Sequence, residues 1–123
     1  MTIRKGELHF DEVDLPTTKR TVHPEAVPFD VTANYPASRV RLTHIPAGMR
    51  EVTWHTVPEP VLTVRLDGSV TYKASDGEIR HVGAGSFVLV EDNHGKGHLS
   101  RHSPEAQTVI WISLPNSFDM PPE

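Results

Sequence analysis

Between residues 39 and 114 the chain alternates hydrophobic with polar positions or passes through short apolar runs. In the segment 39–45, Val40, Leu42 and His44 share one face, which is typical of a half-buried β-strand. The nearly continuous apolar run at 61–66 is typical of a buried strand. No segment shows the 3.6-residue period of an amphipathic helix. The same criteria predict further strands at 50–57, 69–75, 78–82, 86–91 and 108–114.

Turn signals separate these strands. Asp67-Gly68 and Asp76-Gly77 are both predicted to be hairpin turns, and Gly83-Ala84-Gly85 is predicted to be a strand corner. Many short strands at regular spacing predict a closed or double-sheet β structure. An open sandwich of immunoglobulin type is the alternative, but the Asp-Gly turns and the glycine corner favour a jelly roll.

The domain organisation is simple, because 123 residues suit one hydrophobic core. Residues 1–38 are punctuated by proline and weakly patterned, so we expect an extended N-terminal arm with short strands; a disordered tail is the alternative. The barrel is predicted over 39–114. The prolines that follow indicate a C-terminal tail over 115–123.

Composition excludes several classes of function. The net charge of −4 argues against nucleic acid as a partner, because phosphate binding needs a basic face. The absence of cysteine excludes disulfides, thiolate zinc sites and cysteine nucleophiles, so a metal would need histidine or carboxylate ligands. No window approaches the roughly 18 apolar residues of a membrane span, and the N-terminus lacks the apolar core of a signal peptide. We therefore expect a soluble, cytoplasmic protein that binds neither membrane nor nucleic acid.

The stretch from His55 to His98 resembles the conserved half of a small cupin barrel. His55 matches the first histidine of the family's first motif, and Gly68 matches the glycine that closes it. Gly85 matches the start of the second motif, and His98 matches its histidine if the loop Gly95-Lys96-Gly97 contains a two-residue insertion. The resemblance covers about residues 39–113, and the Gly-Lys-Gly-His segment is similar to that of small single-domain cupins. It implies a double-stranded β-helix, histidines from separate strands meeting in one pocket, and a homodimer in which the arm pairs with the neighbouring subunit.

The departures from the motif bear on metal binding. A cupin metal usually takes three histidines and a glutamate, but Val57 and Val61 stand at the second histidine and the glutamate positions. Valine has no lone pair to donate. His55 and His98 are the remaining predicted metal ligands, and a third would have to be recruited, for example His44. No cofactor is favoured, and a divalent metal is the alternative.

Strand alternation predicts which side chains face the barrel interior. Histidine titrates near neutral pH and suits proton transfer, Asp92 could orient His98 or act as a base, and an inward Arg65 could hold a substrate carboxylate by a bidentate pair. For Arg65 the alternative is a place at the barrel rim beside an acidic side chain. The predicted site comprises His55, His98 and Asp92 as catalytic residues, and His44, Val57, Val61, Thr63, Arg65 and His102 as substrate-binding residues.

Three functions remain open. The leading hypothesis is a small-molecule-binding cupin with metal-independent acid–base chemistry of isomerase or lyase type. The second is a metal-dependent cupin enzyme of dioxygenase or isomerase type. The third is a ligand-binding or sensing module without turnover.

Overall fold

The computed structural model describes residues 2–4, 7–10, 12, 14–21, 23–48, 59–91, 98–102 and 104–119. Within these ranges all regular structure is β-strand, and none of them holds a helix able to cross a membrane. Each strand predicted within the described part of the barrel is present, with bounds that differ by at most one residue; the predicted strand 50–57 lies outside it. The strands are β1 (Thr2–Arg4), β2 (Glu7–His9), β3 (Thr18–Arg20), β4 (Phe29–Val31), β5 (Arg39–Ile45), β6 (Val61–Arg65), β7 (Ser69–Ala74), β8 (Ile79–Gly83), β9 (Phe87–Val90), β10 (His98–His102) and β11 (Gln107–Ser113).

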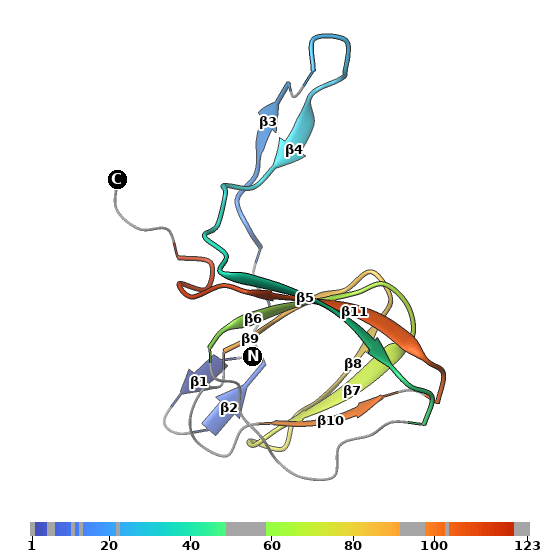
Figure 1. Cartoon of the computed structure of the whole chain (residues 1–123). Helices are drawn as coiled ribbons and strands as arrows, with labels where there is room; N and C mark the ends of the chain where they lie inside the picture. The colour runs from blue at the N-terminus through green and yellow to red at the C-terminus, as the bar shows by residue number, and fades with distance from the viewer. Residues whose placement is uncertain are drawn as a thin grey trace.

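Two antiparallel sheets face each other and form the barrel (Figure 1). One has the strand order β5-β11-β6-β9 and the other the order β10-β7-β8. From β6 onward the chain passes from the first sheet to the second for β7 and β8, returns for β9, crosses again for β10 and ends in the first sheet with β11. This winding between two facing sheets is the jelly-roll arrangement. The predicted all-β jelly-roll barrel is therefore confirmed.

The predicted hairpin at Asp67-Gly68 is wrong. This dipeptide joins β6 to β7, which lie in different sheets, so it forms a corner between the sheets. Asp67 accepts a hydrogen bond from the backbone N–H of Thr108 (2.6 Å), and Gly68 has a φ of +67°. An Asp-Gly pair suits any tight turn that needs left-handed backbone, and only long-range pairing decides whether the flanking strands become neighbours.

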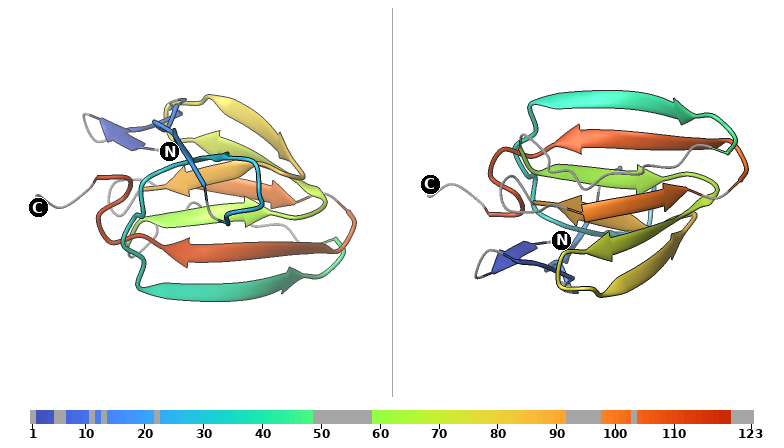
Figure 2. Two further views of the ribbon diagram at one scale, coloured as in Figure 1. Left: turned by 90° about the horizontal axis from the view of Figure 1, so that it is seen from above. Right: turned by 90° about the horizontal axis from the view of Figure 1, so that it is seen from below.

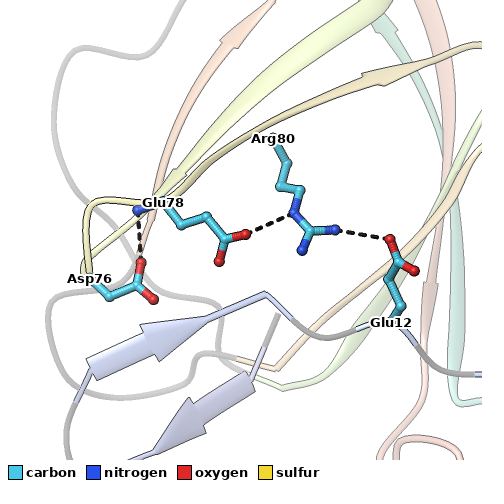
Figure 3. A network of polar contacts seen from close by, with 4 residues as sticks. All are labelled: Glu12, Asp76, Glu78 and Arg80. Atoms are coloured by element: carbon cyan, nitrogen blue, oxygen red, sulfur yellow. Dashed lines mark hydrogen bonds and ion pairs between the residues drawn. The ribbon is translucent and has the colours of Figure 1, made fainter.

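The second Asp-Gly pair does form a hairpin, between β7 and β8 (Figure 3). Gly77 has a φ of +94°, and Lys73 pairs with Ile79 beside the turn. The carboxylate of Asp76 accepts a hydrogen bond from the backbone N–H of Glu78 (2.9 Å), which closes the turn. Here local turn chemistry and sheet pairing agree.

The apolar core gathers between the sheets around Val70, Tyr72, Ala74 and Val90. Phe10, from the segment after β2, packs against this cluster and is partly buried. The segment is also tied to β8 by polar contacts, since Arg80 bonds Glu78 (3.0 Å) and Glu12 (3.2 Å) (Figure 3). The hydrogen bond to Glu78 is the main reason why the pKa of Arg80 lies above its ordinary value. The N-terminal segment is thereby fastened to the barrel.

Two short hairpins precede the barrel. The β1–β2 hairpin lies beside β7, whereas the β3–β4 hairpin extends away on the outer side of the four-stranded sheet (Figures 1 and 2). In the second hairpin Lys19 pairs with Asp30 across the strands, with 3.2 Å between the ammonium and the carboxylate. That ion pair is exposed, so it fixes register more than it stabilises the fold.

Candidate functional site

A cavity of about 760 Å³ lies inside the barrel, between the two sheets. A second hollow of about 1050 Å³ lies outside it, among the N-terminal segment, the turn at 117–119 and β9. Only the first gathers histidine side chains among its described lining residues, which makes it the candidate site. Its described lining residues are Arg39, Val40, Arg41, Ile45, Glu59, Val61, Thr63, Arg65, Tyr72, Val90, His98, Ser100, His102, Trp111 and Ser113.

His98 stands on the wall formed by the three-stranded sheet and is 4% exposed. Alternation along β10 turns His98, Ser100 and His102 toward the cavity, as the pattern predicts. The ring of Tyr72, on the neighbouring strand β7, meets the imidazole of His98 edge to face, with 6.0 Å between ring centroids. The ring contact and burial hold His98 in a defined orientation.

Arg65 approaches from the opposite wall, at the end of β6, and is only 2% exposed. Its Nη1 donates to the side-chain oxygen of Gln107, whose amide nitrogen in turn donates to the carbonyl of Ser69 (2.8 Å). Within the described residues no carboxylate lies within ion-pair distance of the guanidinium, and its buried Nε has no hydrogen-bond partner. The alternative of a rim arginine beside an acid is therefore wrong for the part of the chain that the structure describes.

Val61 and Thr63 share the face of β6 that Arg65 occupies, and both line the cavity. Alternation of side chains along the strand predicts that these three residues share one face. The valine at the family's glutamate position thus contributes an apolar patch to the wall. Whether these side chains contact a substrate stays a prediction.

His44 does not belong to the described wall. The predicted alternation of β5 is present, but the face holding Val40, Leu42 and His44 points outward. Leu42 is 76% exposed, and Val40 is 65% exposed although it also borders the cavity. His44 is exposed and is not among the described lining residues of the cavity. The apolar character of Val40 and Leu42 indicated a core-facing side, whereas the inner face carries Arg41, Thr43 and Ile45.

Three predicted site residues lie outside the described residues: His55, Val57 and Asp92. Their predicted roles stay predictions. Of the other predicted residues, the structure brings Val61, Thr63, Arg65, His98 and His102 together around one cavity.

The sequence interpretation missed Arg39, Arg41, Tyr72 and Trp111 as lining residues. Arg39 and Arg41 are two residues apart on one strand, which puts both side chains on the same side of the sheet. Trp111 lies opposite both Arg41 and Thr63 in the sheet register. That pairing joins segments about fifty to seventy residues apart in sequence, which no local pattern reveals.

The described residues offer no metal site of the kind that cupins use. They contain no group of three or more histidine, aspartate or glutamate side chains that could hold an ion. His98 and His102 alone do not supply the three protein ligands that tight catalytic sites usually have. The described donor set therefore does not fit a metal, and the contribution of His55 stays a prediction.

Comparisons with known proteins return matches to solved structures alone, since no family model and no curated protein matches the chain. A cupin 2 conserved barrel domain protein from Leptotrichia buccalis is 18% identical, with a TM-score of 0.49 over 87% of this chain and 44% of its own. A cupin protein from Bacteroides fragilis is 15% identical, with a TM-score of 0.48 over 98% and 93%. An RmlC-like cupin family protein with a double-stranded β-helix fold, from Methanocaldococcus jannaschii, is 15% identical, with a TM-score of 0.44 over 94% of each chain.

At such identities and TM-scores these likenesses say nothing about ligand or activity. The strand order does not depend on them. By that order, with two facing sheets and the chain winding between them, this chain is a jelly-roll barrel.

Proposed function

We propose that the chain binds a small organic acid inside the barrel and moves a proton on it without a metal, in a reaction of isomerase or lyase type. One observation carries the proposal: His98 and Arg65 are almost completely buried, come from opposite sheets and line the same cavity. A guanidinium can hold a carboxylate by two parallel hydrogen bonds. An imidazole on the facing wall can then reach the carbon skeleton of the held acid.

In this scheme His98 takes a proton from a carbon of the bound acid, and the electron pair of that C–H bond stays on the substrate. Return of the proton to another atom gives isomerisation, whereas departure of a leaving group that accepts it gives elimination. His55 and Asp92 keep their predicted roles as a second proton carrier and as the group that orients an imidazole.

The test is proton exchange in heavy water. The protein is incubated with a panel of small carboxylic acids, and loss of C–H signals is followed by NMR while binding is followed by thermal stabilisation. We expect His98→Gln to reduce exchange by about 100-fold or more, the usual contribution of a positioned proton carrier, while ligand-induced stabilisation remains. His44→Gln is the matched control, because His44 is exposed and outside the described cavity wall.

Exchange by His98→Gln at the wild-type rate would remove His98 from the mechanism. Binding without exchange in the wild-type protein would favour the non-catalytic binding module. The metal-dependent alternative needs about one equivalent of metal in untagged protein by elemental analysis, together with loss of exchange on chelation.

A further inference from the structure

The charge of Arg65 is not balanced by the described part of the protein. Its side chain is 98% buried, and its only side-chain hydrogen bond among the described residues goes to the neutral amide of Gln107. A buried cation is costly unless an opposite charge and full hydrogen bonding compensate it. Because Arg65 lines the cavity, an anion bound there would balance its charge.

Two further arginines line the same cavity at its exposed side. Arg39 and Arg41 share the inner face of β5 and are solvent-exposed, unlike Arg65. In the sheet, Arg41 on β5 pairs with Trp111 on β11, and Trp111 pairs with Thr63 on β6. Thr63 lies two residues before Arg65 on the same strand. With about 4.8 Å between strands and 3.4 Å per residue, the Cα atoms of Arg41 and Arg65 lie roughly 12 Å apart. Their side chains take up part of that span, which leaves room for a short ligand between them.

The described cavity wall carries a positive net charge, whereas the net charge of the whole chain is negative. The described lining residues include three arginines, and Glu59 is the one carboxylate among them, while the whole chain carries −4. A concave wall of one sign focuses its field and attracts ligands of the opposite sign. The cavity thus has an inner and an outer cationic end, separated by the apolar and hydroxyl surface of Val61 and Thr63.

We propose that the ligand is a short dicarboxylate: one carboxylate pairs with Arg65 at the buried end and the other with Arg39 and Arg41 at the exposed end. This inference rests on the proposed function and deepens it, because it names the class of acid that the same cavity takes. Trp111 and Thr63 flank the chain between the two carboxylates.

The test compares succinate, glutarate and adipate with butyrate, valerate and hexanoate, the monocarboxylates of the same lengths, by calorimetric titration. We expect at least one dicarboxylate to bind tenfold or more tightly than its matched monocarboxylate. The double variant Arg39→Gln/Arg41→Gln should abolish that preference, because dicarboxylates lose the partner of their second carboxylate and fall to the affinity of the matched monocarboxylates. Arg101→Gln is the control for loss of a positive charge, because Arg101 is exposed on β10 and is not among the described lining residues.

The preference for dicarboxylates over monocarboxylates should also fall as the salt concentration is raised, because Arg39 and Arg41 are exposed and salt screens their charges.

Equal affinity for the two series, or a preference that survives the double variant, would overturn this inference while leaving the proposed function intact. Absence of binding by every acid in both series would overturn the proposed function as well. Arg65→Lys separates the two ends: it keeps the buried charge but removes the bidentate pair, so it should weaken both series alike. A loss confined to dicarboxylates in Arg65→Lys would contradict the assignment of the inner carboxylate.

Discussion

At the scale of single residues, Gln107 organises the buried end of the cavity. It is fully buried, accepts a hydrogen bond from Arg65 on β6 and donates one to the carbonyl of Ser69 at the start of β7. One neutral side chain thus links both sheets and orients the guanidinium. The corner glycine Gly68 packs directly on it, since a Cβ at that position would overlap the side chain of Gln107.

Gly68→Ala should therefore both destabilise the fold and weaken acid binding. The left-handed φ and the collision with Gln107 together should cost about 1–3 kcal/mol in the free energy of unfolding, measured with urea. Displacement of Gln107 should also turn Arg65 away from its ligand and raise the dissociation constant. Gly77→Ala is the matched control, because Gly77 also has a positive φ but has no heavy atom within 4 Å of the added Cβ. Equal unfolding and binding effects in the two variants would contradict the role assigned to Gln107.

At the scale of elements, the N-terminal segment is held by one apolar contact and one polar network. Arg80 joins Glu12 to β8 (Figure 3). Phe10 packs against the core cluster, and its ring centroid lies 5.6 Å from the guanidinium carbon of Arg80. The polar groups are exposed, so solvent screens their attraction. The apolar contact should therefore dominate attachment.

Phe10→Ala should lower the free energy of unfolding by about 1–2 kcal/mol, the value for losing a partly buried aromatic side chain. Glu12→Gln keeps the shape of the side chain and removes its charge. The midpoint of urea-induced unfolding of this variant should stay within experimental error of that of the wild-type protein. A loss of stability in Glu12→Gln as large as that in Phe10→Ala would show that the ion pair, and not burial, holds the segment.

At the scale of the whole molecule, the outer face of the four-stranded sheet is apolar from edge to edge. Val40, Leu42 and Phe87 on it are 65%, 76% and 70% exposed. Two register rows cross the sheet: Leu42, Ile110, Val64 and Phe87; and Val40, Ile112, Leu62 and Leu89.

We expect a second copy of the chain to cover this face, in line with the homodimer predicted from the sequence. The β3–β4 hairpin stands off the same side and exposes Val27 and Phe29, which a two-fold partner would also cover (Figures 1 and 2). Leu42→Glu should raise the dimer dissociation constant at least tenfold, measured by light scattering during gel filtration, because a charge would be buried. Ile79→Glu, on the other sheet and 53% exposed, should leave it unchanged. A monomeric wild-type protein, or equal dissociation in both variants, would contradict the dimer.

The sequence by itself determined the predicted barrel strands within the described residues, the two Asp-Gly turns and the alternation of side chains along β5, β6 and β10. These features are local: a period of two sorts side chains onto two faces, and Asp-Gly pairs turn the backbone wherever they stand. The faces of β6 and β10 that line the cavity could be predicted from the alternation of side chains along each strand, together with the positions of Val61 and His98 in the family motifs. Val61, Thr63, Arg65, His98 and His102 were found in this way.

Only the tertiary structure decided which face of a strand is covered and which strands become neighbours. It turned Val40, Leu42 and His44 outward, brought Arg39 and Arg41 into the cavity wall, and made Asp67-Gly68 a corner between sheets. It also left Arg65 buried beside the neutral Gln107, with no carboxylate paired to it among the described residues. Alternation gives two faces without saying which one packs, because burial depends on segments far away in the chain.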